Sequence, residues 1–456
     1  MSGELPAGWM RFSLKDLGGL SGGKTPSKAN SEFWSSRDVP WVSPKDMKKN
    51  QLEDAEDSIS QIAVDEAGMT LYPAGSVLMV TRSGILQHTF PVALAGAELT
   101  VNQDIKVLRP IAGIAPKFSF YMLKSFGGEI LSACSKDGTT VQSIDSDKLE
   151  AFPFPLPPLA EQTRIAAKLD ELLAQVDTLK ARIDGIPALL KRFRQSVLAA
   201  AISGRLTEEW RKERALPEFS EVELGHLIKE GPQNGLYKPS SAYGSGVKII
   251  RIDGFYSGEI TGWEGLRSLE VDLRELESWG VREGDILINR VNSIEYLGKC
   301  ALVRSVPEPT VYESNIMRMS LKSDLVHPEY LMRFLSSEVG RKKLISKAKH
   351  AVNQASINQG DVKACKVPLP TVEEQTEIVR RVEQLFAFAD QLEAKVKEAK
   401  TRIDRLTQSI LAKAFRGELV AQHPSDEPAS ELLARIQAQR ASAPKAKRGR
   451  KKAENP

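Results

Sequence analysis

The chain has 456 residues, which is enough for two to four domains of ordinary size. It is 41% hydrophobic with a mean hydropathy of −0.28, and it has no apolar run of the roughly 18–20 residues that a membrane span needs, so disordered and membrane classes are excluded. The net charge of +4 is uneven: residues 441–456 carry +5 and the remaining chain carries −1, so any nucleic-acid surface on the body must be a local patch.

The cysteines and the N-terminal residues bear on the compartment. Cys134, Cys300 and Cys365 are odd in number and far apart, which excludes a disulfide framework and a CxxC zinc site. Residues 1–6 lack the basic-then-apolar layout of a signal peptide. We therefore expect a cytoplasmic protein.

The first motif along the chain, Gly18 to Thr25, satisfies the phosphate-loop pattern GxxxxGK[ST]. Such a loop binds phosphates only between a buried strand and a helix whose N-terminus faces the anion. Pro26 follows Thr25 directly, and residues 27–34 show no helical period of apolar residues. We interpret the segment as a glycine-rich turn in a binding loop rather than as part of a nucleoside triphosphatase.

Two stretches of the chain, 1–154 and 211–367, are predicted to be mixed α and β domains. Short apolar or alternating runs bounded by Gly, Pro and Asp indicate strands, and a short helical pattern follows in each stretch. The predicted strands are 76–80, 104–108, 247–252, 285–288 and 316–321, and the predicted helices are 117–125 and 328–337.

A long helical segment follows each of these stretches. Residues 373–415 keep apolar residues at alternating steps of four and three, which is a coiled-coil seam about 64 Å long at 1.5 Å per residue. Residues 155–210 carry the same register, although Gly185-Ile186-Pro187 is predicted to interrupt and kink the helix. The predicted seam consists of Ile165, Leu169, Leu172, Val176, Leu179, Ile183, Ile378, Val382, Leu385, Leu392, Val396, Ile403, Leu406 and Ile410.

The chain also repeats itself at an offset of 213 residues. The sequence Pro-Leu-Pro-Pro-Leu-Ala-Glu-Gln begins at Pro155 and Pro-Leu-Pro-Thr-Val-Glu-Glu-Gln begins at Pro368, and the similarity continues without a gap to Leu206 and Leu419. Such a chain is two copies of one unit, and two matching seams are most simply explained by antiparallel pairing with each other, as a rigid spacer.

The predicted fold class is α+β, with a pseudo-twofold internal repeat of two mixed α/β domains separated by an antiparallel pair of coiled-coil helices. The predicted segments are domain 1–154, helical segment 155–210, domain 211–367, helical segment 368–422, and residues 423–456 with a short helix at 430–439 and a disordered basic tail.

Catalytic and metal-binding motifs are missing from the sequence. The five histidines show no HExxH spacing, and there is no GxSxG motif. The glycine-rich cofactor loop and the Asn-Pro-Pro-aromatic tetrapeptide of DNA adenine methyltransferases are also missing. We therefore expect neither a catalytic residue nor a metal site in this chain.

Several motifs together carry a family resemblance. The first domain contains Gly22-Gly23-Lys24-Thr25-Pro26-Ser27, then Phe33-Trp34 and Val39-Pro40-Trp41, and the helices contain the doubled Glu-Gln motif and Gln408-Ser409-Ile410-Leu411-Ala412. Over nearly its whole length the chain resembles the specificity subunits of type I restriction–modification systems, most of all the enterobacterial K-type (IA) subfamily. Lys24 is an insertion into the family's Gly-Gly-Thr-Pro-Ser pattern.

The resemblance implies a non-catalytic, DNA-binding subunit of a phage-defence system. Each target-recognition domain would read one half of a bipartite, asymmetric site in double-stranded DNA, and the helices would set the unread spacer between the halves. Two modification subunits with S-adenosylmethionine would dock on the helices and methylate adenine. Two restriction subunits would supply ATP- and Mg-dependent translocation and cleavage.

Polar and basic loop residues are the candidates for DNA contacts, because Arg, Lys, Asn and Gln read base edges while phosphate contacts set the register. Arg290 and Asn292 follow a predicted strand and suit guanine and adenine respectively, and Lys343 lies in a cationic run suited to phosphate. The predicted DNA-binding residues are Lys24, Thr25, Ser43, Lys45, Arg82, Ser83, Gln87, Asn234, Tyr237, Lys238, Arg251, Arg290, Asn292 and Lys343.

Three other functions remain open at this point. The chain could be the specificity subunit of a modification-only methyltransferase complex, which only its partner subunits would distinguish. It could instead be a coiled-coil tether whose globular ends bind proteins, and such a tether would show no sequence preference on DNA. A stand-alone enzyme is disfavoured by the missing catalytic motifs.

Overall fold

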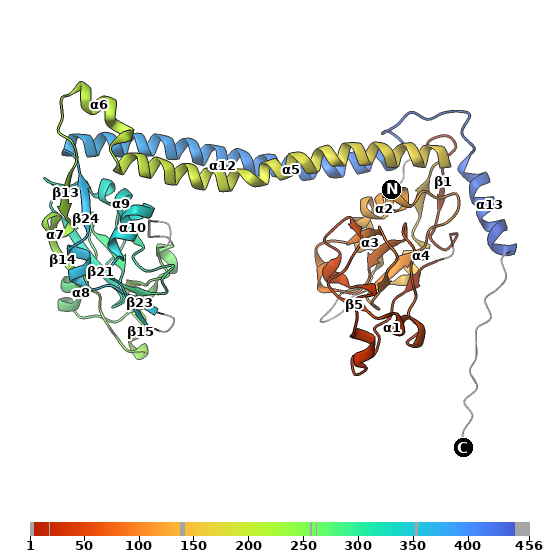
Figure 1. Ribbon diagram of the computed structural model, residues 1–456, viewed down its shortest axis with the longest axis horizontal. Coiled ribbons are helices and arrows are strands. Elements are labelled where there is room, and N and C mark those ends of the chain that lie inside the picture. The colour runs from red at the N-terminus through yellow and green to blue at the C-terminus, as the bar shows by residue number, and fades with distance from the viewer. Residues whose placement is uncertain are drawn as a thin grey trace, which may run out of the picture. The chain divides into compact units, whose positions relative to one another are not determined.

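The computed structural model describes residues 4–17, 19–136, 142–255, 258–260, 262–351 and 354–442. The chain divides into two compact units: unit 1 comprises residues 1–182 and 399–456, and unit 2 comprises residues 183–398. Two helices of 44 residues each, α5 (Leu159–Ile202) and α12 (Val372–Phe415), contribute to both units (Figure 1).

Unit 1 is built on a five-stranded sheet of order β2-β9-β6-β7-β4 and a three-stranded sheet of order β5-β3-β8. Its central strands are buried along their whole length, as continuous apolar runs require. The strands are β1 (Met10–Phe12), β2 (Ser21–Gly22), β3 (Val39–Val42), β4 (Gln51–Leu52), β5 (Ser58–Ile59), β6 (Val77–Val80), β7 (Val92–Ala95), β8 (Thr100–Val101), β9 (Ile105–Leu108), β10 (Ser135–Lys136), β11 (Ser143–Ile144) and β12 (Phe154–Leu156). The other helices are α1 (Gln61–Glu66), α2 (Pro116–Ser125), α3 (Gly127–Cys134), α4 (Ser146–Ala151) and α13 (Ala429–Ser442).

Unit 2 is built on a four-stranded sheet of order β14-β21-β17-β19 and on two three-stranded sheets, β16-β15-β20 and β18-β23-β22. The strands are β13 (Ser220–Glu223), β14 (Ile228–Asn234), β15 (Tyr243–Ile250), β16 (Arg267–Leu269), β17 (Ile286–Asn289), β18 (Val291–Asn292), β19 (Cys300–Leu302), β20 (Thr310–Tyr312), β21 (Ile316–Leu321), β22 (Lys349–Ala351), β23 (Gln354–Ser356) and β24 (Lys366–Leu369). The helices are α6 (Glu208–Glu213), α7 (Leu224–Leu227), α8 (Leu273–Trp279), α9 (Pro328–Ser336), α10 (Glu338–Leu344) and α11 (Gln359–Lys363), and α9 and α10 lie beneath the long helices (Figure 1).

The two units share one topology, which confirms the predicted duplication and the mixed α and β composition. In unit 1, β6 lies between β7 and β9 with antiparallel pairing on both sides, and in unit 2, β17 lies between β19 and β21 in the same way. The parallel pair β3–β8 recurs as β15–β20. The five predicted strands and both short helices are present, although β15 begins earlier than predicted, at Tyr243.

The long helices pair antiparallel within each unit. In unit 1, Lys180 of α5 forms an ion pair with Asp404 of α12 (3.6 Å), and in unit 2, Arg194 of α5 reaches Asp390 (2.6 Å) and Glu393 (2.9 Å) of α12. Since residue numbers rise along α5 as they fall along α12, the predicted antiparallel pair is confirmed.

Burial along the predicted seam is uneven. Seam residues that also join a domain core, such as Ile165 in unit 1 and Ile378 in unit 2, are fully buried. Leu179 and Leu406 are each 47% exposed, although the predicted seam would bury them. Where the two helices pack only against each other, one flank of each side chain stays open to water. Leu169, Val176, Val382 and Ile403 are buried, and Leu172, Ile183, Leu385, Leu392, Val396 and Ile410 are half-buried.

The predicted interruption at Gly185-Ile186-Pro187 is wrong. Helix α5 continues through Pro187, although a proline removes one helical hydrogen bond. Beyond it, Leu190, Val197, Leu198 and Ala201 are buried. Their packing offsets the cost of the proline, since tertiary contacts along an apolar face supply most of a helix's stability.

The glutamine of the repeated Glu-Gln motif ties each long helix to its own domain. Gln162 donates from Nε2 to the carbonyl of Pro157 (3.0 Å), and its Oε1 accepts from the amide of Ala115 (3.1 Å) at the start of α2. In unit 2, Gln375 makes the equivalent bonds, with the amide of His327 (2.7 Å) at the start of α9. Both glutamine side chains are fully buried, so the motif fixes α2 and α9 against the helix that follows each domain.

Replacing Gln375 with Leu should lower the free energy of unfolding by about 1–3 kcal/mol, because the half-buried amide of His327 loses its acceptor. Urea denaturation followed by circular dichroism measures the change. Gln408→Leu, at an exposed position of α12, is the matched control and should stay within about 0.5 kcal/mol of the unaltered chain. Equal losses in the two variants would contradict the role given to the motif.

The predicted short helix near the C-terminus is confirmed as α13, which packs Leu432, Leu433 and Ile436 into the core of unit 1. The predicted basic tail, residues 445–452, lies outside the described residues. The predicted segment boundaries stay a prediction, since the two compact units divide within the long helices. Within the described part of the chain, none of the helices has the length and hydropathy of a membrane span, and no group of His, Cys, Asp and Glu is placed to hold a metal ion.

Candidate nucleic-acid interface

A glycine turn in unit 1 places two of the predicted DNA-binding residues. A side chain at Gly23 would collide with the carbonyl oxygens of Val101 and Asn102, so glycine is required there. The amide of Lys24 donates to the carbonyl of Val101 (3.0 Å), and the Thr25 hydroxyl donates to the side chain of Gln103. No helix follows the turn directly, as a phosphate loop would need, because the next element is a short 3-10 helix at Ser31–Trp34.

The same turn recurs in unit 2. A side chain at Gly235 would collide with the carbonyl oxygens of Tyr312 and Glu313, and the amide of Leu236 donates to the carbonyl of Tyr312 (2.9 Å). Tyr237 therefore occupies the position of Thr25, and it is 79% exposed. An aromatic ring so exposed can make an apolar contact with a thymine methyl group in the major groove of duplex DNA.

An indole braces each turn from within its own unit. In unit 1, Trp41 Nε1 donates to the carbonyl of Lys24 (3.0 Å), and in unit 2, Trp279 Nε1 donates to the carbonyl of Asn234 (3.0 Å). The two tryptophans come from different elements, a strand in one unit and a helix in the other. The turn is therefore held in place in both units although the supporting sequence has changed.

Strand ends supply a second, matching group of residues. Val80 of β6 pairs with Ile105 and Asn289 of β17 pairs with Ile316, so the residues that follow each strand correspond. By this register Arg290 matches Thr81, and Asn292 matches Ser83. The predicted residues Ser83 and Asn292 therefore occupy equivalent positions in the two units.

Arg290 and Asn292 hold donors without partners among the described residues. The Nη1 of Arg290 donates to the carbonyl of Ser314 (3.1 Å), but its Nε is buried and unpaired, and the Nδ2 of Asn292 is in the same state. A buried unpaired donor costs about 1–3 kcal/mol, which an acceptor on a bound molecule would recover. Acceptors of this kind line the major groove of DNA.

Charged partners restrain several other predicted residues. Hydrogen bonds with Asp57 (2.9 Å) and with Glu56 (3.0 Å) raise the pKa of Lys45. Lys238 lies 2.7 Å from Glu275, and its hydrogen bond lowers the pKa of that carboxylate. These lysines reach a phosphate only if they exchange their present partners for it.

Ser43 directly follows β3, which pairs in parallel with β8, and Arg251 directly follows β15, which pairs in parallel with β20. These two residues therefore also occupy equivalent positions in the two units. Ser43 caps a turn by donating from Oγ to Asp46 (3.0 Å), and Arg251 Nε lies 3.2 Å from Glu313. Although burial opposes its charge, Glu313 raises the pKa of Arg251.

The remaining predicted residues either are exposed or lie apart from the glycine turns and the strand-end residues. Arg82 and Gln87 are exposed next to Ser83, and Gln87 ends a 3-10 helix at Gly84–Gln87. The Nζ of Lys24 donates to the carbonyl of Ala67 (2.6 Å). Lys343 of α10 pairs with Glu221 of β13 (2.6 Å) rather than with the strand-end residues.

One loop that sequence reasoning missed joins the two groups in each unit. Gln103 contacts the turn residue Thr25, and in unit 2 the carbonyl of Ser314 accepts from Arg290. The two loops precede β9 and β21 and occupy corresponding positions. These loops could have been found from the sequence by aligning β9 with β21 at an offset of 211 residues. That offset differs from the 213 residues that separate the repeated positions of the long helices, so a comparison of the sequence with itself at one fixed offset misses it.

Comparisons with known proteins agree with a doubled architecture. A family model described as the type I restriction modification DNA specificity domain matches residues 6–188 and 219–400. The chain is 35% identical to the type I restriction enzyme EcoKI specificity subunit of Escherichia coli K12, and 34% identical to the StySPI specificity subunit of Salmonella potsdam, with 99% of each chain covered in both cases.

Solved structures share the fold. The HsdS subunit from Thermoanaerobacter tengcongensis is 19% identical and superposes with a TM-score of 0.56 over 92% of this chain and 99% of its own. A chain from a structural study of complex assembly and conformational transition in the type I R-M system is 21% identical, with a TM-score of 0.63 over 91% of this chain and all of its own.

Proposed function

The chain belongs to the family of type I restriction–modification DNA specificity subunits, and from this premise we propose that it reads a bipartite DNA target, one half with each unit. It is the specificity subunit of a type I system. One observation carries the proposal: both units present side chains from the same three places, a glycine turn, a strand end and the loop between them. A protein that reads two half-sites needs two such groups.

The two groups differ in the side chains that they present. The turn carries Thr25 in unit 1 and Tyr237 in unit 2, and the strand end carries Thr81 in unit 1 and Arg290 in unit 2. Because different side chains favour different base edges, the two halves of the target should have different sequences. The target is therefore asymmetric.

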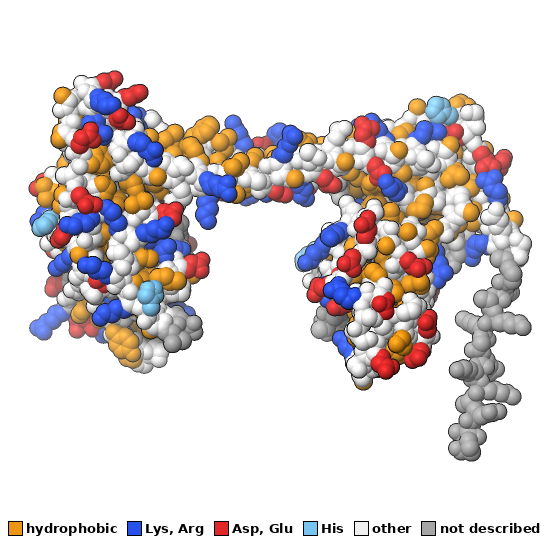
Figure 2. Space-filling model, in the orientation of Figure 1, with side chains coloured by type: hydrophobic (Ala, Val, Ile, Leu, Met, Phe, Trp, Pro, Cys, Tyr) orange, Lys and Arg blue, Asp and Glu red, His pale blue; other side chains and the backbone are white. Residues whose placement is uncertain are grey.

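We further propose that modification subunits dock on the long helices. Apolar side chains are exposed there (Figure 2), among them Leu189 (59%) and Phe388 (54%) of unit 2. Exposed apolar groups of this size on a helix favour contact with another protein. In this proposal two modification subunits hold S-adenosylmethionine, two restriction subunits hold ATP and Mg, this chain holds no cofactor, and the complex works in the cytoplasm.

Replacing Arg290 with Ala should weaken discrimination at the second half-site by about 1–3 kcal/mol, since a bidentate base contact is lost there. Preference at the first half-site should stay unchanged, because Arg290 belongs to unit 2 alone. Selection of binding sites by the assembled complex from random duplexes measures both. The assignment would be contradicted if base discrimination weakened equally at both half-sites, or if it weakened at neither.

Lys343→Met is the contrasting variant. Loss of a phosphate contact should weaken binding evenly across sequences and flatten its dependence on salt.

The same selection separates the alternative functions only in part. A modification-only complex would give the same base preferences and is distinguished by its missing restriction subunits. A protein tether would give no base preference at all.

A further inference from the structure

Each unit carries a pair of short antiparallel strands that is attached to its strand-end residues. In unit 1 the pair is β10–β11, and the amide of Ile144 donates to the carbonyl of Thr81 (2.8 Å). In unit 2 it is β22–β23, and the amide of Ile357 donates to the carbonyl of Arg290 (2.9 Å). Because Thr81 and Arg290 occupy equivalent positions, the two strand pairs are attached in the same way. The predicted DNA-binding residues include none from either strand pair.

The two strand pairs have three residues in common, although the rest of their sequence differs. Residues 134–145 align with residues 347–358 at the offset of 213. The identical residues are Lys136 and Lys349, Ser143 and Ser356, and Ile144 and Ile357. The two isoleucines are 5% and 1% exposed and pack into the cores of their units. Packing therefore explains the isoleucines but not the lysines and serines.

The lysine and the serine of each unit form one cross-strand pair. The strand register places Lys136 opposite Ser143, and Lys349 opposite Ser356. Residues directly opposite each other in an antiparallel pair project from the same face, with Cβ atoms about 4.5–5.5 Å apart. An ammonium and a hydroxyl at that separation can both donate to the oxygens of one phosphate group.

Both groups are available in unit 2. Lys349 is exposed, and neither its ammonium nor the hydroxyl of Ser356 has a hydrogen bond or ion pair with another described residue. In unit 1, Lys136 is 58% exposed and lies 3.4 Å from Asp145. Asn358 takes the position of Asp145 in unit 2, so the neutralising acid is replaced there by an uncharged side chain.

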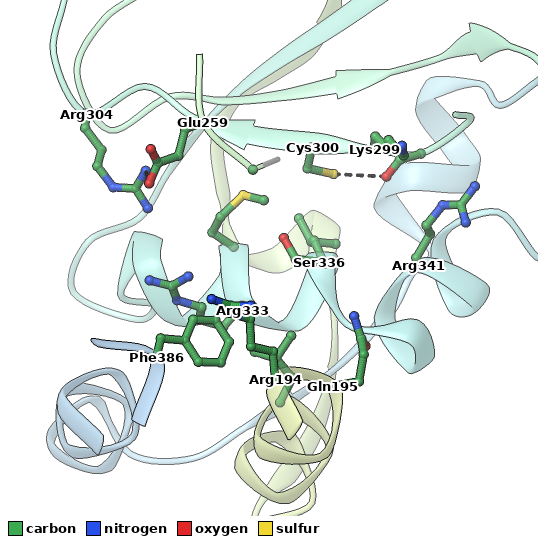
Figure 3. Close-up of a pocket in the computed structure, with 15 residues that line it drawn as sticks. Arg194, Gln195, Glu259, Lys299, Cys300, Arg304, Arg333, Ser336, Arg341 and Phe386 are labelled. Atoms are coloured by element: carbon green, nitrogen blue, oxygen red, sulfur yellow. Dashed lines mark hydrogen bonds and ion pairs between the residues drawn. The ribbon is translucent and has the colours of Figure 1, made fainter. Parts of the chain in front are cut away.

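The sequence around Lys349 is cationic. Residues 339–360 contain five lysine or arginine residues and no acidic residue. Lys342 and Lys343 each form an ion pair of 2.6 Å with a glutamate. Arg341 borders the pocket shown in Figure 3 and donates to three backbone carbonyls at 2.7–3.0 Å. Since Lys349 is unpaired within the described part of unit 2, its charge is left for an external anion.

Each lysine–serine pair continues a row that begins at a strand-end residue. In unit 1, Ser143 lies opposite Arg82, which is itself a predicted DNA-binding residue. In unit 2, Ser356 lies opposite Val291, directly before Asn292, and β23 separates β22 from β18. Neighbouring strands are about 4.8 Å apart, so the lysine strand lies about 10 Å from the strand-end residues. The phosphates that border a major groove about 12 Å wide lie at a similar distance from the bases read within it.

We propose that the lysine–serine pair of each unit binds one phosphate of the DNA backbone, Lys349 with Ser356 in unit 2 and Lys136 with Ser143 in unit 1. The inference rests on the proposed function, because such a contact sets the register in which the neighbouring side chains read bases. The contact in unit 2 is the stronger one, since the phosphate displaces no acid there, whereas in unit 1 it displaces Asp145.

Binding of the target duplex by the assembled complex, measured at several salt concentrations, tests the proposal. Lys349→Met should weaken binding about tenfold and reduce the slope of log K against log salt by about one, because one fewer counterion is released. Ser356→Ala should weaken binding about threefold at an unchanged slope, because a hydrogen bond is lost but no charge. Base preferences in a site selection should stay unchanged in both variants, because the contact is with the backbone.

Lys212→Met is the matched control. It removes the same charge from α6, which lies beside α12 at the opposite end of unit 2 from β23 (Figure 1), and it should leave affinity and slope unchanged. Neutralising single phosphates of the second half-site as methylphosphonates gives a readout that a damaged fold cannot imitate. At one position the substitution should weaken binding by the unaltered complex but not by Lys349→Met, since that contact is already lost.

Several results would overturn the proposal while the proposed function stands. They are an unchanged salt slope in Lys349→Met, an equal change in Lys212→Met, an unchanged affinity in Ser356→Ala, and a methylphosphonate scan in which no position distinguishes Lys349→Met from the unaltered complex. Altered base preferences in Lys349→Met would also overturn it, because the lysine would then contact a base. A complex without any base preference would instead overturn the proposed function itself.

Discussion

Replacing Arg211 with Met should lower the free energy of unfolding by about 3–5 kcal/mol, the largest loss that we expect from a single side chain. Its guanidinium lies 2.9 Å from Glu374 and 3.1 Å from the carbonyl of Gly204, and both charged side chains are buried. Without it, the hydroxyl of Thr207 (2.6 Å) is the one donor that the carboxylate of Glu374 keeps among the described residues. An unpaired charge in the interior is far more costly than a missing surface pair.

The matched control is Arg214→Met, which removes an exposed arginine 3.4 Å from Glu373 in the same region. That change should cost no more than about 1 kcal/mol, as exposed ion pairs do. The double variant Arg211→Met with Glu374→Leu should recover much of the loss, since no charge is then left buried. Urea denaturation measures all three, and equal losses in Arg211→Met and Arg214→Met would contradict the role of the buried pair.

Inserting seven residues into both long helices should move the two half-sites apart. The insertion points that keep the helices in register follow Lys180 in α5 and Ile403 in α12, because Lys180 lies opposite Asp404. Seven residues preserve the seam and add about 10 Å, which corresponds to roughly three base pairs of DNA. Site selection by the assembled complex should return the same half-sites with a spacer about three base pairs longer.

A one-sided insertion is the control for this experiment. Seven residues added to α5 alone put the two seams out of register and should abolish recognition of the target. If the matched insertion left the spacer unchanged, the helix pair would not set the distance between the half-sites.

The second long helix was predictable almost to the residue, and the arrangement of the candidate DNA-contact residues was not. A heptad pattern gives the same signal at every turn, so the predicted helix at 373–415 corresponds to α12, Val372–Phe415. The prediction failed only where tertiary contacts decide: Pro187 stays within a helix, and Leu179 stays exposed because no domain covers it.

The arrangement of the candidate DNA-contact residues depends on contacts that sequence does not display. Glycine turns and strand ends could be found as motifs, but the acids that restrain Lys45 and Lys238 lie 12 and 37 residues further along the chain, and no motif connects them. The loops before β9 and β21 carried no motif of their own. Their importance follows from strand register, which only the three-dimensional structure provides.

Selection of bound duplexes from random DNA by the complex that contains this chain tests the central claim most directly. We predict two short preferred sequences, different from each other and separated by a spacer of fixed length without base preference. Exchanging residues 211–367 for those of another specificity subunit should change one of the two sequences and leave the other intact. A single continuous preferred sequence, or a change in both halves after the exchange, would contradict the claim that each unit reads its own half of the target.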